Sequence, residues 1–349
     1  MNRSDVSLSA GLASRHVRMP PEEAAALAAA RYGLSGAMRR FDTEKDDTFR
    51  IATADRGGFV LKVANPDEPV DEIDLQTSLL EHVARADPSL PVPRIVATLD
   101  GENGFLHRDE AGQIRHVRLL TFLDGTPLSD TGSTGPEREK VGEILARLRL
   151  ATAGFEHPAD GRVLPLDVKH LSALSGLLVH VDAPRQRDAL QRGLGRFAGI
   201  EPRLAGCRIQ VLHNDFSRSN IVVDHDRPEF VTGIIDFGDA VRTAIAIDVS
   251  TALLNQLPPV ARDDLFLEGR DVLRGYLRHA DLLDEERALV PHLVMGRVIA
   301  RALLTIWRAR LIPENSRYIL RNTEQGWSQL DWFLARTVDE VSAQLMGAP

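Results

Sequence analysis

Three polar residues in the second half of the chain have side chains and a spacing that suit phosphoryl transfer. Asp215 and Asn220 fit the pattern Asp-x-x-x-x-Asn, and Asp236 follows in the run Asp236-Phe237-Gly238. Phosphoryl transfer needs an aligned hydroxyl, a metal ion on the phosphate oxygens and a group that takes the hydroxyl proton. Asp215 is the candidate catalytic base. The side-chain oxygens of Asn220 and Asp236 are hard ligands, which makes these residues candidates for binding Mg²⁺.

The segments around these residues are expected to form a β-hairpin. Apolar residues lead into His213, a second apolar segment follows Asn220, and a third, 231–235, ends at Asp236. Such a hairpin brings Asn220 and Asp236 side by side. Polar residues of this kind often only form turns, but turn formation does not account for their order and their flanking strands together.

The elements around this β-rich region predict an α+β protein with two lobes. A chain of 349 residues is longer than one core usually covers. We expect an N-terminal tail at 1–19, a β-rich N-lobe at 20–122 and a larger, mostly helical C-lobe at 123–345, with a hinge at 123–128. The expected N-lobe strands are 39–41, 48–52, 58–63, 95–98 and 116–122. The expected helices are 20–32, 71–84, one that starts near 136 and includes 141–148, 174–181, 185–196, 249–256, 261–279, 285–310 and 324–343.

Composition narrows the possible partners. The formal net charge of −8 argues against nucleic acid or an anionic membrane as the main partner. No apolar run reaches the roughly 18 to 20 residues that a spanning helix needs. Cys207 is the single cysteine, so no disulfide framework is possible. We therefore expect a cytoplasmic protein, monomeric or homodimeric, that acts on a small molecule.

The catalytic motifs resemble those of a known family. The run from His213 to Asn220, together with the run from Ile234 to Asp239, is similar to motifs of the aminoglycoside phosphotransferase and choline kinase group. That group usually has His-Gly-Asp, so Asn214 stands in place of a glycine. Asp248 resembles the structural aspartate of the group. The resemblance implies a two-lobed, protein-kinase-like fold with ATP or GTP between the lobes and Mg²⁺ as the metal ion.

The same resemblance implies a nucleotide site in the N-lobe. The run 44–49 looks like the nucleotide loop of the family and suggests Asp47 and Thr48 as nucleotide-binding residues. Lys62, in Val60-Leu61-Lys62-Val63, resembles the lysine that contacts phosphate oxygens. Thr121 and Leu123 at the hinge are the expected partners of the purine.

The phosphate-binding lysine of such proteins normally pairs with an acid on the next helix. Glu72 is our choice for that partner, and Asp74 is an alternative. Gln76 occupies a position where some relatives place the acid.

The substrate is suggested by segments elsewhere in the chain. The segments 145–158 and 295–327 resemble the hydroxylysine kinase branch of the family, which implies a hydroxylated amino acid or amino alcohol as acceptor. An acid near Asp215 would suit an ammonium group, and an arginine would suit a carboxylate. The candidates are Asp239 for the ammonium group, Arg242, Arg297 and Arg301 for the carboxylate, and Arg218 for the phosphate or the substrate.

Three other functions stay open. The first is an aminoglycoside or macrolide kinase that confers resistance. The second is a homoserine or choline kinase, because the expected helix 71–84 is similar to that of homoserine kinase. The third alternative is an inactive relative that binds nucleotide or a partner. The presence of Lys62, Asp215, Asn220 and Asp236 argues against this last alternative.

Overall fold

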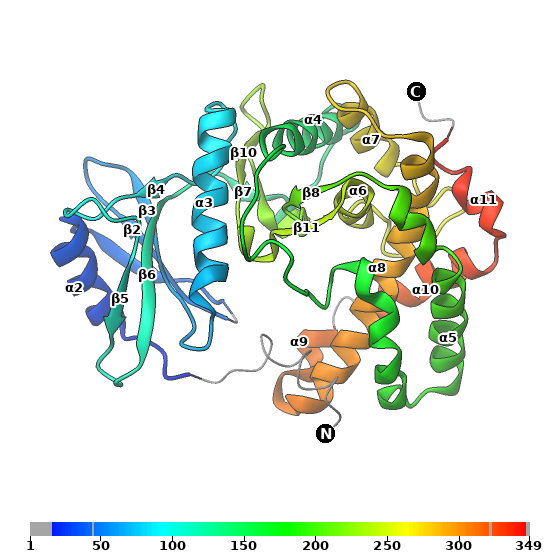
Figure 1. Cartoon of the computed structure of the whole chain (residues 1–349), viewed down its shortest axis with the longest axis horizontal. Helices are drawn as coiled ribbons and strands as arrows, with labels where there is room; N and C mark the ends of the chain where they lie inside the picture. The colour runs from blue at the N-terminus through cyan, green and yellow to red at the C-terminus, as the bar shows by residue number, and fades with distance from the viewer. Residues whose placement is uncertain (1–15, 44, 321–322, 347–349) are drawn as a thin grey trace.

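The protein has a β-rich lobe and a larger helical lobe, with helix α3 (Val70–Ala86) standing between them (Figure 1). The computed structural model describes residues 16–43, 45–320 and 323–346. Most of the expected tail therefore lies outside the described residues. Residues 16–19 run along the β-rich lobe, where the Met19 side chain is buried. The lobe boundaries at 19, 122 and 345 remain a prediction.

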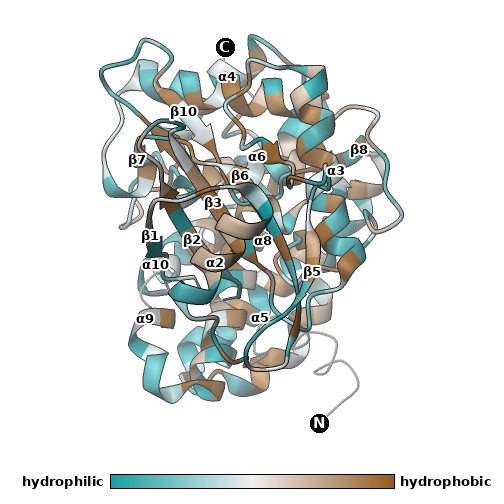
Figure 2. Ribbon diagram, turned by 90° about the vertical axis from the view of Figure 1, so that its left-hand side faces the viewer, coloured by the Kyte–Doolittle hydropathy of each residue, from teal (hydrophilic) through white to brown (hydrophobic). Residues whose placement is uncertain are grey.

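The N-lobe is an antiparallel sheet in the order β1-β2-β3-β6-β4, with β5 paired to β6. Its strands are β1 (Ala37–Arg40), β2 (Asp47–Ala52), β3 (Gly58–Val63), β4 (Ile95–Val96), β5 (Phe105–Arg108) and β6 (Ile114–Thr121). Strand β5 was not expected from the sequence, because the turn at 100–104 leads into it rather than directly into β6. Helix α2 (Pro21–Tyr32) crosses one face of the sheet and shares a hydrophobic core with it (Figure 2).

The pairing of β2, β3 and β6 places two charged side chains and a hydroxyl on the face of the sheet opposite to α2. Lys62 on β3 is opposite Thr48 on β2 and opposite Arg118 on β6. Side chains directly opposite one another in an antiparallel pair lie on the same face. This face is turned toward α3 and the C-lobe.

Helix α3 is amphipathic and belongs to the core of the large lobe. Leu75, Leu79, Leu80 and Val83 are buried and lie in one hydrophobic cluster with residues of the C-lobe. The sheet has its own cluster with α2. The helix therefore joins the nucleotide-binding sheet to the rest of the molecule.

The C-lobe is built around the long helix α8 (Asp284–Leu311). By length and composition alone α8 could cross a membrane, but 83% of its most apolar window is buried inside the molecule. It packs against α5, α6, α10 and α11, which identifies it as a core helix. The C-lobe helices are α4 (Gly135–Ala151), α5 (Pro184–Ala198), α6 (Ile245–Leu254), α7 (Gly269–Leu277), α8, α9 (Ser316–Leu320), α10 (Thr323–Leu334) and α11 (Val338–Ser342), with a 3₁₀ segment at Val168–His180.

Two expected helices are shorter than the sequence suggested. Residues 261–268 precede α7, because backbone groups there bond to side chains of α10: the Ala261 N–H donates to Ser328 and the Asp263 carbonyl accepts from Trp332. The expected helix 324–343 is divided into α10 and α11. A capping box formed by Thr337 and Glu340 begins α11.

Small strands of the C-lobe position the catalytic motifs. Strand β8 (Ile209–Leu212) pairs with β11 (Val241–Ala244), and β9 (Ile221–Val223) forms the expected hairpin with β10 (Val231–Ile234). Strand β7 (Thr126–Pro127), which lies within the predicted hinge, adds to β9. Gly125 makes this crossing possible, because a Cβ there would lie 2.7 Å from atoms of Val222, Val223 and Thr232.

Candidate active site

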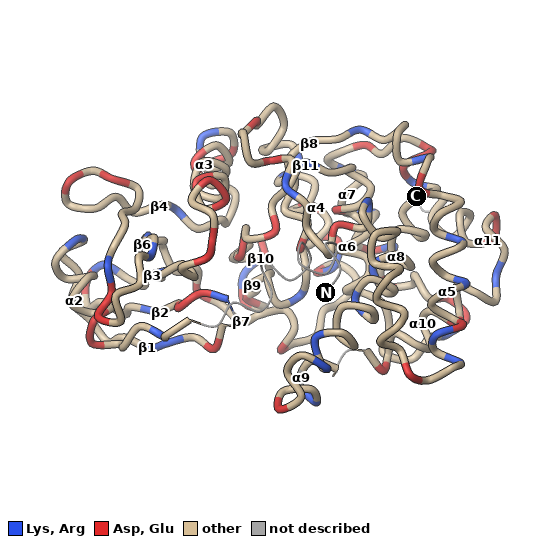
Figure 3. The backbone as a smooth tube through the Cα atoms, turned by 60° about the horizontal axis from the view of Figure 1, so that its bottom comes forward, with Lys and Arg blue, Asp and Glu red and all other residues tan. Residues whose placement is uncertain are grey.

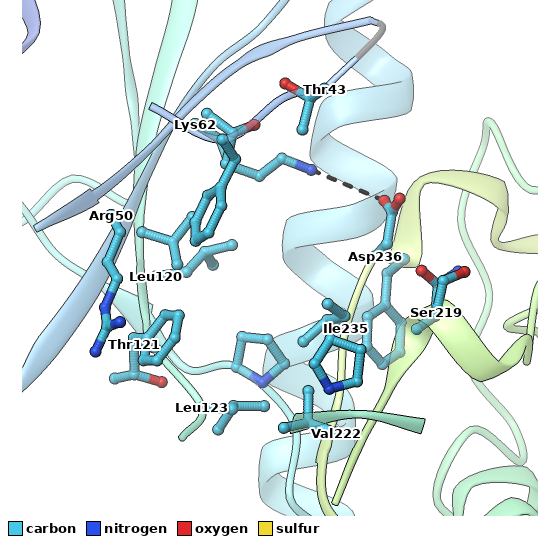
Figure 4. A pocket seen from close by; sticks show the side chains of 18 of the residues that line it. Thr43, Arg50, Lys62, Leu120, Thr121, Leu123, Ser219, Val222, Ile235 and Asp236 are labelled. Carbon is cyan, nitrogen blue, oxygen red and sulfur yellow. Dashed lines mark ion pairs between the residues drawn. The ribbon is translucent and has the colours of Figure 1, made fainter. Parts of the chain in front are cut away.

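A cavity of about 720 Å³ separates the sheet from the β9–β10 hairpin. Both lobes line it, and six of the sequence-predicted site residues are among the lining residues: Thr48, Lys62, Thr121, Leu123, Asn220 and Asp236. Figure 4 shows Lys62 extended toward Asp236 at one end, with Leu123 and Val222 near the other. Two opposite charges therefore face each other at the catalytic end, and apolar side chains line part of the hinge end.

Asp215 lies in the loop beside Asn220, which lines the catalytic end of the cavity. The Asn220 side-chain amide donates to the Asp215 carboxylate at 2.7 Å and to the Asp215 carbonyl at 3.0 Å. Arg297 Nη2 is 3.8 Å from the other carboxylate oxygen. Burial raises the pKa of Asp215, the Arg297 guanidinium opposes this, and the negative charge of Asp236 adds to it. A raised pKa makes the carboxylate a stronger base.

Hydrogen bonds from neighbouring residues hold this loop. The Asp215 N–H donates to His213 Nδ1, so the proton of His213 is on Nε2, which donates to the Ile235 carbonyl at 3.0 Å. Asn214 has a positive φ of 59°, and its N–H donates to the buried Asp248 carboxylate at 2.7 Å. Asparagine tolerates this left-handed conformation better than most residues, which is why it can replace glycine here.

Asp236 and Asn220 offer oxygen atoms suited to a divalent metal ion. Asp236 lies at the end of β10, and its side chain is 56% exposed toward the cavity. The Lys62 ammonium, 3.9 Å away, holds the pKa of Asp236 below its usual range. Because Asn220 uses its amide nitrogen to bond Asp215, its amide oxygen is left for a ligand. These two residues fit Mg²⁺, which usually takes one or two protein ligands with phosphate oxygens and water.

The described part of the chain contains no larger acidic or histidine cluster that could serve as an alternative metal site. There, no group of three or more His, Cys, Asp or Glu side chains is placed to hold a metal ion. A metal ion at Asn220 and Asp236 would therefore complete its coordination with oxygen atoms of water or of a bound nucleotide.

The expected pair between Lys62 and Glu72 is not formed. Glu72 is bonded to Arg162 at 2.6 Å, and Asp74 is bonded to His157 at 3.0 Å. Both acids lie near the N-terminus of α3 and turn toward the C-lobe. The acids near the Lys62 ammonium are Asp236 and Asp46, the latter at 3.7 Å.

Asp47 is also placed differently from the sequence-based expectation. Its side chain is fully buried and accepts from Arg115 at 2.7 Å and from the Met19 N–H at 2.9 Å. Arg40 also contacts it. Asp47 therefore faces the α2 side of the sheet, whereas its neighbour Thr48 lines the cavity. Asp47 is a structural residue of the N-lobe and not a nucleotide ligand.

At the hinge, Leu123 offers a free donor. Within the described residues, its N–H makes no hydrogen bond. The Thr121 N–H donates to the Arg94 carbonyl, and its hydroxyl accepts from the Arg94 N–H. The Thr121 side chain therefore ties the hinge to β4, while Leu123 can donate to a purine.

The candidate substrate residues divide into two groups. Arg218 donates to the carbonyls of Leu128 and Thr131, and Arg242 is paired with Asp160 at 2.6 Å. These pairings satisfy both guanidiniums away from Asp215, so the expectation that they bind substrate is not supported.

The charges of Asp239, Arg297 and Arg301 interact with that of Asp215, and Arg297 is within salt-bridge distance of it, at 3.8 Å. Burial raises the pKa of Asp239 to about 6, and the charges of Asp215 and Asp236 contribute. Arg297 is almost completely buried and donates to the Asn214 carbonyl at 3.0 Å. Burial lowers the pKa of Arg301 to about 10, and the Arg297 charge contributes.

Sequence reasoning did not identify Arg118 and Arg162. Arg118 lines the cavity beside Lys62. Arg162 joins Glu72 to the backbone after Asp236, since it also donates to the Gly238 and Ala240 carbonyls. A signal for Arg118 was present, because it is a charged residue inside the otherwise apolar run 117–120.

A family model described as the phosphotransferase enzyme family matches residues 39–289. This chain belongs to that family. A hydroxylysine kinase of Danio rerio is 28% identical over 328 residues, covering 89% of this chain and 90% of that protein. A homoserine kinase of Mesorhizobium japonicum is 28% identical over 260 residues, covering 71% of this chain and 73% of that protein.

Solved structures of phosphotransferases share the fold. A microcompartment-associated aminopropanol kinase superposes with a TM-score of 0.63 at 20% identity, covering 88% of this chain and 96% of that chain. An amicoumacin kinase in complex with AMP-PNP, Ca²⁺ and Ami superposes with a TM-score of 0.63 at 15% identity, covering 96% and 98%. The expected two-lobed, protein-kinase-like α+β fold is confirmed, and the chain is a small-molecule phosphotransferase.

Proposed function

We propose that this phosphotransferase transfers the γ-phosphoryl group of ATP or GTP to a hydroxyl of an amino acid or amino alcohol, with Mg²⁺ as the metal ion. A hydroxylysine-like acceptor is favoured. The observation that carries the proposal is the hydrogen bond between Asp215 and Asn220, since Asn220 lines the cavity together with Lys62 and Asp236.

Each of these residues has a role in the proposed reaction. Asp215 takes the proton of the acceptor hydroxyl, and its raised pKa favours this transfer. Asn220 orients the Asp215 carboxylate through its amide nitrogen, and its oxygen holds the metal ion together with Asp236. Lys62 binds phosphate oxygens as a point charge. Mg²⁺, when bound, neutralises charge on the β- and γ-phosphate oxygens.

The surroundings of Asp215 favour an acceptor with a carboxylate as well as an amine. Arg301 is half-buried, and within the described residues it forms no salt bridge. A buried cation is costly unless an anion pairs with it. A substrate carboxylate at Arg301 supplies that anion, while Asp239 suits an ammonium group.

A resistance kinase for polycationic drugs is less favoured. Proteins that bind such drugs benefit from a rim of acidic residues. In the described chain, acidic and basic residues are interspersed over both lobes (Figure 3). The arginines beside Asp215 also repel a polycation.

The test is a nucleoside-diphosphate release assay with the purified protein, Mg²⁺ and ATP or GTP. The acceptor panel contains hydroxylysine, homoserine, choline, ethanolamine and kanamycin, with Asp215→Asn protein as the matched control. We expect the wild type to release nucleoside diphosphate with hydroxylysine, and Asp215→Asn not to do so. Release with kanamycin instead contradicts the amino-acid assignment, and silence with every acceptor contradicts the proposed acceptor class.

A further inference from the structure

Arg118 is a buried cation in the wall of the nucleotide cavity. It lies on β6 directly opposite Lys62 on β3, so both side chains project from the same face of the sheet. Both line the cavity, and Arg118 is 5% exposed. Two basic residues are thus adjacent where the proposed function places the phosphates.

The hydrogen-bond partners of Arg118 are all neutral. Its guanidinium donates to the Ile73 carbonyl at 3.1 Å, to the Thr77 hydroxyl at 3.4 Å and to the Gln76 side-chain oxygen. All three acceptors belong to α3. Within the described residues, no carboxylate lies within salt-bridge distance of Arg118, although Asp46, Glu68 and Asp236 act on it from further away.

The charge of Arg118 is not needed to hold α3. An arginine has five N–H donors, and α3 provides three acceptors, so part of the guanidinium is left for another partner. Neutral acceptors can be satisfied by a neutral donor, whereas burying an unpaired cation carries a large desolvation penalty. Burial indeed lowers the pKa of Arg118. A positive charge at this position therefore suggests an anionic ligand.

We propose that Arg118 is a second cation of the phosphate site, beside Lys62, and that the neutral Gln76 keeps this charge available to the nucleotide. The inference rests on the proposed function, because it assumes that a nucleoside triphosphate occupies the cavity. An acid at the position of Gln76 on α3 would form an ion pair with the Arg118 guanidinium and neutralise its charge.

The experiment compares the binding of adenosine, AMP, ADP and ATP, or of the guanosine series if GTP is the donor, by titration calorimetry with Mg²⁺. Arg118→Met keeps an apolar stem of similar length and removes the charge. We expect adenosine to bind as in the wild type, whereas ATP binding weakens by about 10- to 100-fold, as for loss of a hydrogen bond to a charged group. The loss should grow with the number of phosphates.

A second variant tests the same idea with the anchor of α3 intact. Gln76→Glu keeps the contact to Arg118 but adds a carboxylate that neutralises it. We expect the ratio of ATP affinity to adenosine affinity to fall in this variant as well. Since the hydrogen bond to α3 is retained, this variant decides the question if Arg118→Met does not fold.

Arg50→Met is the matched control. Arg50 also lines the cavity but lies over the Phe122 ring at the hinge end, 4.0 Å from its centroid. Its loss should change adenosine and ATP binding to the same extent. One outcome overturns the Arg118 assignment alone. In it, the wild type binds ATP tightly, and the ratio of ATP affinity to adenosine affinity is the same in Arg118→Met and Gln76→Glu as in the wild type. A wild type that binds no nucleotide overturns the proposed function, and this inference with it.

Discussion

Replacing Asp47 with alanine separates its observed structural role from the nucleotide-binding role that the sequence suggested. Asp47 is fully buried in the sheet and accepts hydrogen bonds from Arg115 and the Met19 N–H. In Asp47→Ala, the Arg115 guanidinium, itself fully buried, loses its nearest carboxylate, at 2.7 Å, and keeps only the more distant Asp109 carboxylate, at 3.9 Å. We expect the N-lobe to be strongly destabilised while the geometry of the phosphate site is unchanged in molecules that remain folded.

The size of the effect follows from these contacts. Removing one partner of a buried ion pair costs about 3 to 5 kcal/mol, because an uncompensated charge stays buried. Arg115 keeps its bonds to the Ala64 and Val63 carbonyls and the Asp109 carboxylate at 3.9 Å, so we expect a cost toward the lower end of this range. A loss of this size is a large fraction of the stability of a typical domain, about 5 to 15 kcal/mol.

The assay is urea unfolding followed by fluorescence, with ATP affinity measured under native conditions. Asp55→Ala is the control, because Asp55 is an exposed acid in the turn between β2 and β3, and surface changes of this kind usually stay within about 0.5 kcal/mol. A variant with wild-type stability but much weaker ATP binding would refute this reasoning and restore Asp47 as a nucleotide ligand.

The destabilisation should also depend on pH. Burial alone would raise the pKa of Asp47, but the Met19 N–H and Arg115 outweigh it and lower the pKa below its usual range. A carboxyl group with a depressed folded-state pKa stabilises the protein above its unfolded pKa of about 3.9. This contribution is lost as the pH falls through the folded-state pKa. The stability difference between the wild type and Asp47→Ala should therefore be constant near neutral pH and shrink below about pH 4.

Three further predictions concern the catalytic end of the cavity. Asp215→Asn should lower turnover by a factor on the order of 10² or more while ATP affinity is kept; unchanged turnover would contradict its role as base. Asp236→Ala should abolish the strengthening of ATP binding by Mg²⁺, and titrations with and without Mg²⁺ that still differ as in the wild type would exclude it as a metal ligand. The pKa of Asp239 is raised to about 6, so its carboxylate is lost as the pH falls through that value, and kcat/KM for an amine substrate should fall with it. Asp239→Asn should lack this acid limb, and a variant that retains the limb would assign the titration to another group.

The catalytic motif was predictable because it is local. Asn220 and Asp236 are joined by a two-stranded hairpin whose apolar strands are evident in the sequence, and the pairing of Ile221 with Ile234 brings the two side chains to one end. Short-range pairing of this kind needs no information from the rest of the chain. The hinge at Gly125 was marked by its glycine and proline for the same reason.

The alternation of side chains along β2 could have corrected one prediction. Successive side chains in a strand point to opposite faces. Asp47 and Thr48 therefore cannot both face the nucleotide. Thr48 is paired with Lys62, so Thr48 is the one on the cavity face of the sheet. Arg115 and Arg118 are three positions apart on β6 and likewise serve opposite faces.

The partner of Lys62 could not be predicted from the sequence. Which acid faces the lysine depends on the rotation of α3 and on contacts with distant segments. Arg162 holds Glu72 and His157 holds Asp74, and both partners come from a C-lobe loop far along the chain. The directions of the Arg218 and Arg242 side chains could not be predicted for the same reason. Their acceptors are distant in the sequence and come near only in the folded chain.

The sharing of α3 between the lobes has a consequence for how the chain folds as it is synthesised. When the hinge has just left the ribosome, the sheet and α2 can already bury their common core, but Leu75, Leu79 and Val83 still face water. Their partners on α4 (Gly135–Ala151) and beyond come later in the chain. The wall of the nucleotide cavity that carries Gln76 and Arg118 is thus completed only when the C-lobe forms, and the nascent N-lobe alone lacks a finished binding site.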